Sequence, residues 1–362
     1  MPLHPADRST TEVYEEDRQR VIYADQLGFE EVFIGEHMSC ATEPIPSPLM
    51  FLASLIHATK QIKLGTGVLS LPNHHPAVVA AEVAQFDHLS NGRFQMGIGP
   101  GGQASDMELF DVLDGKVRNE KMMESIDIIL ELWQTDGPFH IKTNHYDFGI
   151  EKTFIPELSS GKFIRPLQQP HPPILSTAMS PHSNSIKTAV ERGWSPMSAN
   201  FCPVGVVATH WDKYVEGCES IGREPTGEDW RVARNIVIAP TDAEAEDRAL
   251  DPEGGNAFYF RYLFDVLRKG GLSAGMKDDP STPDEDITDE ILVNSLLIYG
   301  SPETVTEKLK ALRETVGPFG GLLMAMADGR GINDQYERES MRLLAEQVMP
   351  HFAANEKVAV AS

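Results

Sequence analysis

An acidic residue and an imidazole, Glu36 and His37, close the apolar run EEVFIGEH at residues 30–37. The run predicts a buried strand, and in a parallel barrel the carboxyl ends of the strands form the catalytic face. Histidine titrates near neutrality, so His37 could donate or accept a proton during a reaction. From its position alone, a structural pair that caps the strand end explains these residues as well as a catalytic pair does.

Two further histidines, His74 and His75, follow the predicted strand at 62–70 and raise the question of a metal site with His37. Adjacent histidines point in different directions, and no carboxylate has ligand spacing to them. The three cysteines show no CxxC pattern and no paired spacing. The sequence therefore predicts no metal site.

A glycine-rich run, GIGPGG, fits the GxGxxG fingerprint through Gly97, Gly99 and Gly102. Pro100 interrupts the turn, and the residues that follow do not open a strong helix. A tight turn from a strand to a loop at a barrel mouth explains these glycines equally well. The run alone does not establish a dinucleotide site.

A serine cluster lies in the segment AMSPHSNSIKTAVERG (178–193), where a predicted strand is followed by a helix. Ser180, Ser183 and Ser185 could bind an anion together with the free backbone N–H groups of the helix start. Ordinary capping of the helix by serine is the alternative. If the fold holds a phosphorylated cofactor, the phosphate interpretation is favoured.

Short apolar runs alternate with amphipathic stretches along the chain. The predicted strands are at 30–37, 62–70, 93–100, 172–178, 195–201, 232–240 and 321–327. The predicted helices are at 11–27, 49–60, 77–90, 118–133, 184–192, 204–221, 242–250, 256–269, 302–314 and 333–349. Repeated strand–helix units indicate an α/β protein with a parallel sheet covered by helices.

A (β/α)8 barrel of the TIM type needs eight parallel strands, one more than the sequence predicts. The missing strand should precede the helix at 11–27, but only MPLHPADRS lies there. We therefore expect a TIM-type barrel whose first strand is missing or truncated at the N-terminus. A doubly wound open sheet is the alternative.

One barrel domain is expected over residues 1–362, with insertions near 134–171 and 271–289. The second insertion is acidic and proline-rich, which predicts a mobile surface loop. Acidic residues outnumber basic ones, 54 to 31, and the formal net charge of −23 excludes nucleic acid and anionic membranes as partners. No signal peptide and no membrane-spanning run is found, so we expect a cytoplasmic protein.

Several motifs, taken in order, resemble the bacterial luciferase-like family of flavin-dependent monooxygenases. They are FIGEHM, IKLGTGVLSLPNHHPAVVAAEVAQFDHLSNGRFQMGIGPG, RPLQQPHPPILSTAMSPHSNSIKTA and LLIYGSPETVTEKLKAL. The last of these, together with FYFRYLFDVLRKGG, is most similar to the limonene and diketocamphane monooxygenase branch. The resemblance covers nearly the whole chain.

The resemblance implies a barrel that binds FMN at its C-terminal mouth, with His37 as the catalytic histidine. The family often has a second histidine next, where Met38 stands here. A cis peptide between Gly67 and Val68 is implied at the flavin-contacting floor. Gly99 occupies the region of a luciferase-specific cysteine, so light emission is not implied.

The implied reaction uses reduced FMN and O2 to place one oxygen atom on a small organic substrate, a terpenoid, ketone or aldehyde, through a flavin C4a-peroxide. Met179, Ser180, Ser183 and Ser185 would bind the cofactor, and a separate flavin reductase would supply it in reduced form. The alternatives are a deazaflavin (F420)-dependent oxidoreductase of the same superfamily and a non-catalytic flavin-binding barrel.

A homodimer is expected from the small residues on the helices at 49–60 and 77–90. These residues, which would let two helices approach closely, are Ala77, Ala80, Ala81 and Ala84. Small residues also suit packing of a helix against its own sheet.

Overall fold

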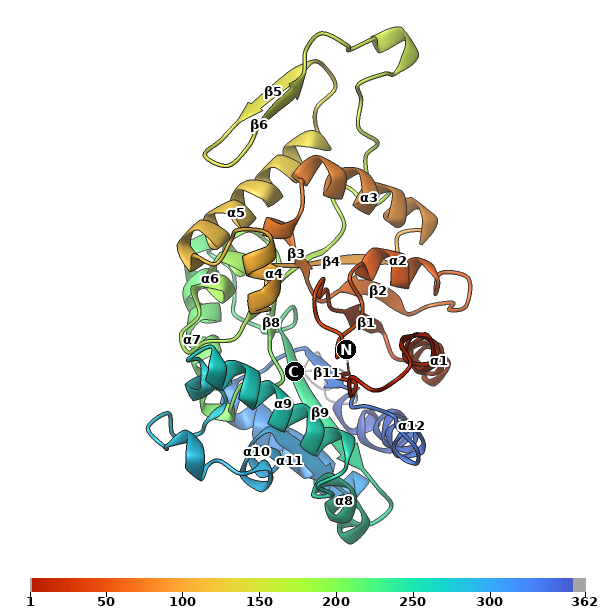
Figure 1. Cartoon of the computed structure of the whole chain (residues 1–362), viewed down its shortest axis with the longest axis vertical. Coiled ribbons are helices and arrows are strands. Elements are labelled where there is room, and N and C mark those ends of the chain that lie inside the picture. The colour runs from red at the N-terminus through yellow and green to blue at the C-terminus, as the bar shows by residue number, and fades with distance from the viewer. Residues whose placement is uncertain (1, 354–362) are drawn as a thin grey trace, which may run out of the picture. The chain divides into compact units, whose positions relative to one another are not determined.

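The computed structural model describes residues 2–353. The chain divides into two compact units. The β1–β4 unit is Glu30–Leu175, and the β8–β11 unit combines Met1–Phe29 with Ser176–Ser362. In both units, strands alternate with helices along the chain (Figure 1).

The β1–β4 unit begins with parallel strands and ends with a hairpin. Its strands are β1 Glu31–Ile34, β2 Lys63–Thr66, β3 Leu69–Ser70, β4 Phe94–Gly99, β5 Phe139–Lys142 and β6 Asp147–Ile150. Its helices are α2 Pro48–Ala53, α3 Pro76–Leu89, α4 Ala104–Leu109 and α5 Gly115–Leu132. β2 pairs in parallel with β1 and β4, and β3 pairs in parallel with β4. The carboxyl ends of these strands therefore share one edge.

The β8–β11 unit is also built on parallel strands. Its strands are the end of β7 Ile174–Ala178, then β8 Ser195–Ser198, β9 Arg231–Ile238, β10 Leu297–Gly300 and β11 Gly321–Ala325. Its helices are α1 Thr10–Leu27, α6 Asn184–Glu191, α7 Val204–Ile221, α8 Asp242–Ala249, α9 Gly255–Lys269, α10 Asp289–Leu296, α11 Pro302–Val316, α12 Asn333–Leu343 and α13 Pro350–Ala353. β9 pairs in parallel with β8, β10 and β11, so it is the central strand of this unit.

A row of apolar side chains along β9 forms the main core of the β8–β11 unit. Trp230, Val232, Ile236 and Ile238 are buried at alternate positions, as the period of a strand requires, and pack with apolar residues of α7 and α11. Arg234 takes the intervening place in this row and is only 2% exposed. A charged group thus interrupts an otherwise apolar layer.

All seven predicted strands are confirmed, and two further pieces of sheet were missed. β10 was missed because α10 runs directly into it: Leu297 both caps the helix and begins the strand. No Gly or Pro stands between the apolar residues at 291–293 and those at 296–299, so no turn signal separates the helix from the strand.

The predicted helix at 49–60 is wrong over its second half, because α2 ends at Ala53. The hydroxyl of Ser54 donates to the carbonyl oxygen of Phe51 at 2.6 Å, which offers the backbone an alternative to helical hydrogen bonds. Short turns follow up to residue 58.

The predicted insertion at 134–171 contains the antiparallel hairpin of β5 and β6, which extends beyond α5 in Figure 1. The Tyr146 hydroxyl lies 2.8 Å from that of Ser125 on α5. The ring of Phe148 lies edge-on to that of His75, 4.6 Å between centroids. These contacts fix the hairpin to the helices beneath it.

The segment 271–289, predicted as a loop, contains two short 3-10 turns, Ser273–Met276 and Asp284–Asp286. Lys277, which is 7% exposed, donates to the carbonyl oxygen of Thr282 at 2.6 Å. Its ammonium group also pairs with Asp284. Polar contacts within the segment therefore hold its two turns together.

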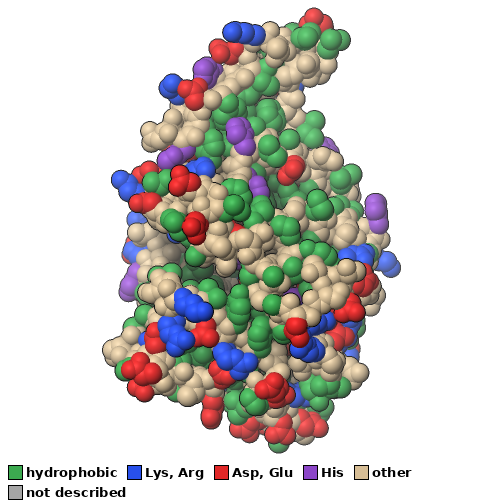
Figure 2. Space-filling model, in the orientation of Figure 1, with side chains coloured by type: hydrophobic (Ala, Val, Ile, Leu, Met, Phe, Trp, Pro, Cys, Tyr) green, Lys and Arg blue, Asp and Glu red, His purple; other side chains and the backbone are tan. Residues whose placement is uncertain are grey.

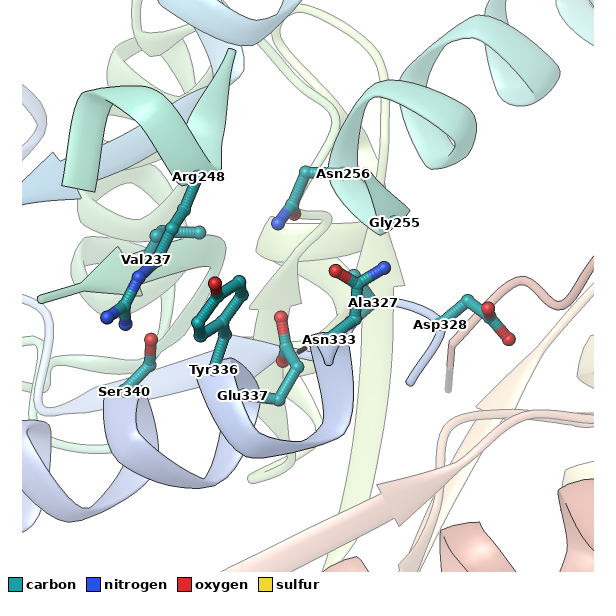
Figure 3. Close-up of a pocket in the computed structure, with 10 residues that line it drawn as sticks. All are labelled: Val237, Arg248, Gly255, Asn256, Ala327, Asp328, Asn333, Tyr336, Glu337 and Ser340. Carbon is teal, nitrogen blue, oxygen red and sulfur yellow. Dashed lines mark hydrogen bonds between the residues drawn. The ribbon is translucent and has the colours of Figure 1, made fainter. Parts of the chain in front are cut away.

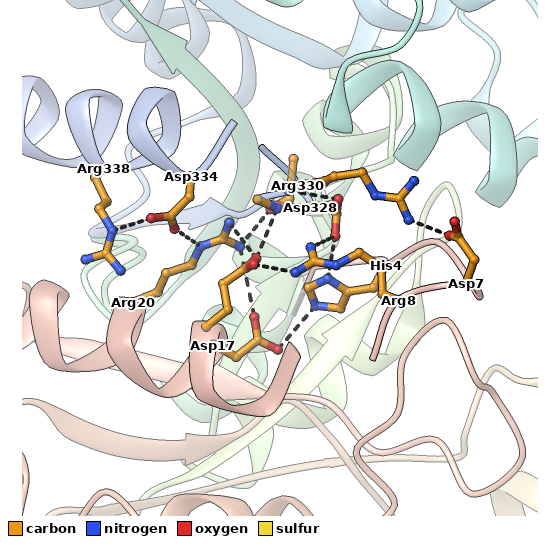
Figure 4. Close-up of polar contacts among 12 residues, drawn as sticks. His4, Asp7, Arg8, Asp17, Arg20, Asp328, Arg330, Asp334 and Arg338 are labelled. Atoms are coloured by element: carbon orange, nitrogen blue, oxygen red, sulfur yellow. Dashed lines mark hydrogen bonds and ion pairs between the residues drawn. The ribbon is translucent and has the colours of Figure 1, made fainter. Parts of the chain in front are cut away.

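Residues 2–9, which precede α1, contain no strand. This segment is instead attached to the residues after β11 by a buried ionic network (Figure 4). The imidazole of His4 lies between Asp328, at 2.7 Å, and Asp17, at 3.3 Å. Arg8 bridges Asp328 and Glu16, at 2.7 and 2.8 Å.

The network contains both acidic and basic side chains, and most of them are shielded from solvent. Burial alone would lower the pKa of His4, but hydrogen bonds to Asp17 and Asp328 and their charges raise it above the ordinary value. Arg20, at the centre, donates to the carbonyl oxygen of Ala327 at 2.8 Å. The residues of the network thus offset one another's charge, which a buried ion requires.

Acidic side chains are dispersed over the surface. On the face that Figure 2 shows, Asp and Glu side chains lie among Lys and Arg. Pairs such as Arg261 with Asp289 and Arg268 with Asp265, at 2.6 and 2.7 Å, are partly exposed, and each contributes little to stability. Among the described helices, none is both long and apolar enough to cross a membrane.

A small polar cavity lies between α8, α9 and α12, and Glu337 points into it (Figure 3). The Glu337 side chain is buried, and its nearest recorded donor is the backbone N–H of Ala327 at 3.5 Å. Burial raises the pKa of Glu337 from 4.5 to about 7, although the nearby charge of Arg20 opposes the shift. The folded protein therefore binds this proton more tightly than the unfolded chain does.

Glu337→Gln is expected to stabilise the protein at pH 8 and to change little at pH 5. Between pH 4.5 and about 7 the unfolded chain releases the Glu337 proton while the folded protein keeps it. Stability therefore falls as pH rises through this window, by about 3 kcal/mol for the full shift. Thermal unfolding of both proteins at pH 5 and pH 8 measures the effect. The exposed Glu314→Gln serves as the control, and an equal shift in both variants would contradict the assignment.

Candidate functional site

Glu36 and His37 lie directly after β1, at the carboxyl edge that β1 shares with β2 and β4. The backbone N–H of His37 donates to the carbonyl oxygen of Ile45 at 3.1 Å, so the loop 38–45 returns to the strand end. A Cβ built on Gly35 would lie 3.5 Å from the carbonyl oxygen of Gly67 and 4.0 Å from His37 Nε2. Gly35 therefore lies between the His37 ring and the Gly67 carbonyl group.

The peptide bond between Gly67 and Val68 is cis, as the family resemblance implied. It separates β2 from β3, and the N–H of Gly67 donates to the carbonyl oxygen of Ile34 at 2.7 Å. Gly99 is the last residue of β4 and pairs with Ser70. The predicted residues His37, Gly67, Val68 and Gly99 therefore share one strand edge of the β1–β4 unit.

The two nitrogens of the His37 ring have different surroundings. Nε2 lies 3.2 Å from a carboxylate oxygen of Glu43. Nδ1 is buried and has no hydrogen-bond partner among the described residues. With the Nε2 proton directed to Glu43, Nδ1 is left as an acceptor that no protein group uses.

The neighbouring histidines have other partners. His74 Nε2 lies 3.0 Å from both carboxylate oxygens of the buried Glu36. Burial lowers the pKa of His74, but the hydrogen bond and charge of Glu36 outweigh it and raise the pKa above its ordinary value. His75 caps α3 by accepting the N–H of Ala77 at 3.2 Å.

The loop after β1 is attached to the loop after β4. The Asp106 carboxylate accepts the backbone N–H groups of Met38 and Ser39 at 2.9 and 2.8 Å, and also bonds the Ser39 hydroxyl. Asp106 lies on α4, in the segment that was predicted not to open a strong helix. α4 is indeed short, and no side chain caps its start.

The serine cluster belongs to the β8–β11 unit. Ser183 precedes α6 but its side chain makes no capping hydrogen bond, so the helix start is not closed by serine in the ordinary way. The Ser183 and Ser185 hydroxyls lie 2.9 Å apart, and Ser185 also donates to the carbonyl oxygen of Thr177 at 2.8 Å. Met179 and Ser180 are exposed, in the loop between β7 and α6.

A buried positive charge lies in the same unit. The Arg234 guanidinium donates to the carbonyl oxygens of Ala233 and Ala199, at 3.0 and 3.5 Å, and its Nη2 has no partner. In the part of the chain that the structure describes, no carboxylate pairs with it. Burial lowers the pKa of Arg234 to about 10, which leaves it charged at neutral pH.

Sequence reasoning missed Glu43, Asp106 and Arg234. Glu43 and Asp106 come from loop and short-helix segments without periodicity, and only folding brings them to the strand end. Arg234 had a detectable signal: it is the one charge within the predicted strand at 232–240. The small residues predicted for a dimer lie in part elsewhere, because Ala80 and Ala84 are buried within their own unit.

Comparison with known proteins gives the same family throughout. A family model described as luciferase-like monooxygenase matches residues 1–317. Limonene 1,2-monooxygenase from Rhodococcus erythropolis is 31% identical over 97% of this chain and 84% of its own length. The oxygenase component of the flavin-dependent trigonelline monooxygenase from Acinetobacter baylyi is 26% identical, over 94% of this chain and 91% of its own length.

Among solved structures, the oxygenating constituent of 3,6-diketocamphane monooxygenase from Pseudomonas putida, in complex with FMN, matches with a TM-score of 0.85. The two sequences are 28% identical, and the match covers 96% of both chains. The predicted α/β barrel fold of the TIM type is thereby confirmed, as are the monooxygenase class and the flavin cofactor. The chain belongs to the luciferase-like monooxygenase family.

Proposed function

We propose that this protein is the oxygenase of a two-component, FMN-dependent monooxygenase. It takes reduced FMN from a separate reductase and uses O2 to place one oxygen atom on a small terpenoid, ketone or aldehyde. The observation that carries this proposal is His37, whose buried Nδ1 has no partner among the described residues and which follows β1 at the strand edge where the cis peptide of Gly67 and Val68 also lies. Family membership supports it.

His37 would donate or accept the proton of the oxygen atom that is transferred to the substrate. Glu43 orients the imidazole through Nε2, so that Nδ1 is free to hold or release a proton toward a reacting atom. At the same strand end, the imidazole of His74 pairs with the buried carboxylate of Glu36. When bound, the reduced flavin supplies the electrons that activate O2.

The residues present fit a flavin with a phosphate. Gly67, Val68 and Gly99, at the shared strand edge, would contact the ring system. Met179, Ser180, Ser183 and Ser185 would hold the phosphate at the start of α6, whose dipole favours an anion. The uncapped helix start and the unpaired charge of Arg234 in the same unit support this assignment.

We further propose that residues 1–362 form one barrel domain, that the protein is cytoplasmic and that it forms a homodimer. On α3, Ala81 is exposed and Ala77 is half-buried, so part of the small-residue stripe remains available to a partner helix. We also propose that His37, His74 and His75 bind no metal.

His37→Ala is expected to reduce product formation by about 10²–10⁴-fold, the usual effect of a lost general acid or base. Binding of reduced FMN should persist, and hydrogen peroxide should replace product. The measurement is product and peroxide per reduced flavin in one turnover, with photoreduced FMN, O2 and a panel of terpenoids, cyclic ketones and aldehydes. Glu43→Gln should fall between the wild type and His37→Ala, because it only orients the ring.

The control is His57→Ala, an exposed histidine after α2, which should behave as the wild type. Normal product yield from a folded His37→Ala variant would end the catalytic assignment. If the wild type oxidises the flavin but forms no product with any of the compounds, the proposed monooxygenase function is wrong for this class of substrate.

Ser180→Ala combined with Ser183→Ala is expected to weaken FMN binding by about tenfold or more and to leave riboflavin binding unchanged. Riboflavin lacks only the phosphate, so the comparison isolates the phosphate contacts. Fluorescence titration with both flavins measures the two dissociation constants. Equal weakening for both flavins, or none, would remove the phosphate site from the start of α6.

Sedimentation velocity at micromolar concentration is expected to give the mass of a dimer. Ala81→Arg should shift the protein to the monomer, because a bulky charge on α3 prevents close approach of a second helix. The control is Lys142→Arg, because this residue of the β5–β6 hairpin is already exposed and charged. A monomeric wild type would disprove the dimer.

A further inference from the structure

The loop between β7 and α6 is held by its backbone from three directions within the β8–β11 unit. The carbonyl oxygen of Met179 accepts the Cys202 thiol at 3.3 Å. The carbonyl oxygen of Ser180 accepts His210 Nε2 at 2.9 Å. The N–H of His182 donates to the Thr209 hydroxyl at 2.8 Å. Two of these three anchors are consecutive residues of α7.

The tautomer of His210 follows from its neighbours. The indole N–H of Trp230 can only donate, and it donates to the Ser198 hydroxyl oxygen at 3.0 Å. The Ser180 carbonyl oxygen can only accept, so in the neutral ring Nε2 carries the proton and Nδ1 accepts from the Ser198 hydroxyl, 2.8 Å away. Nδ1 is therefore an acceptor, and the proton on Nε2 is the one donated to the Ser180 carbonyl oxygen.

Burial makes this chain of hydrogen bonds specific. Trp230, Ser198 and His210 are each 0% exposed, so water does not compete for their polar atoms. Burial also lowers the pKa of His210, which keeps the ring neutral and preserves the donor and acceptor roles. The end of the chain, the carbonyl of Ser180, is the point where the buried layer meets the exposed loop.

The hydrogen bond from the His182 N–H to the Thr209 hydroxyl fixes an uncommon backbone conformation. His182 has φ of 50°, in the left-handed region that residues other than glycine seldom adopt. Its N–H is committed to Thr209, so the turn into α6 has a set direction. The Ser180 backbone is held by His210 of α7, and the Ser183 hydroxyl, which does not cap α6, lies 2.9 Å from that of Ser185.

We propose that His210 is a positioning residue for the cofactor phosphate: by holding the Ser180 carbonyl it sets the shape of the loop whose hydroxyl and N–H groups receive the phosphate. This inference rests on the proposed function, in which that loop binds FMN. His210 does not touch the cofactor. Its effect passes through one hydrogen bond and should be specific for flavins that carry a phosphate.

The test compares His210→Leu with His210→Gln, using FMN and riboflavin as the two probes. Leucine removes both ring nitrogens, and FMN should bind about tenfold more weakly while riboflavin binds as before. Glutamine can donate its amide N–H to the Ser180 carbonyl and should restore most of the FMN affinity. Thermal unfolding shows that the titrated variants are folded. Equal weakening for both flavins would mean a merely structural role and would overturn the proposal.

A second pair of variants acts on the other anchor. Thr209→Val removes the acceptor of the His182 N–H and should also weaken FMN relative to riboflavin, whereas Thr209→Ser keeps the hydroxyl and should not. This pair keeps the proposal testable if His210→Leu does not fold. Unchanged FMN affinity in Thr209→Val, and in His210→Leu where that variant folds, would overturn it.

The same measurements distinguish a failure of the positioning role of His210 from a failure of the proposed phosphate site. If the wild type prefers FMN, loses that preference in the Ser180 and Ser183 variant, and keeps it in His210→Leu, the phosphate site stands and the positioning role is wrong. If the wild type binds both flavins equally, the phosphate site is wrong and the positioning role is overturned with it.

Discussion

Close contact between neighbouring strands is the constraint on which the β1–β4 unit depends. A Cβ built on Gly97 would lie 1.9 Å from the carbonyl oxygen of Thr66, and one on Gly65 would lie 2.5 Å from the ring of Phe33. A side chain at Gly97 would force the backbone to move, and one at Gly65 would displace the ring of Phe33. The Thr66 hydroxyl instead donates to the carbonyl oxygen of Gly97 at 2.8 Å and uses the proximity as a hydrogen bond. The strand ends that carry His37, Gly67 and Gly99 inherit their spacing from these contacts.

The sequence was sufficient for what is local. Short apolar runs located the strands other than β5, β6 and β10, and the end of the run at 30–37 placed His37 correctly at a strand end. The cis peptide at Gly67 came from family resemblance, since no local pattern encodes it. β10 was not predicted, because the boundary between it and α10 is a change of backbone angle at Leu297.

The partners of the candidate site could not be predicted, for a different reason. Glu43 reaches His37 across a loop, Asp106 reaches Met38 from 68 residues away, and His210 reaches Ser180 from 30 residues away. None of these residues belongs to a motif, and each could equally have been a solvated side chain. Their roles follow from which hydrogen-bonding groups the folded chain leaves without water, and that is a property of three-dimensional packing.

The β5–β6 hairpin shows how an insertion becomes part of the fold it was added to. His75 caps the start of α3 with one edge of its ring and packs against Phe148 with another, and Tyr146 shares a hydrogen bond with Ser125 of α5. A redesign that trimmed residues 139–150 as dispensable would remove the Phe148 ring from His75 and leave the buried hydroxyl of Ser125 without Tyr146. Any shortened version of this enzyme for biocatalysis therefore has to replace those two contacts together with the loop.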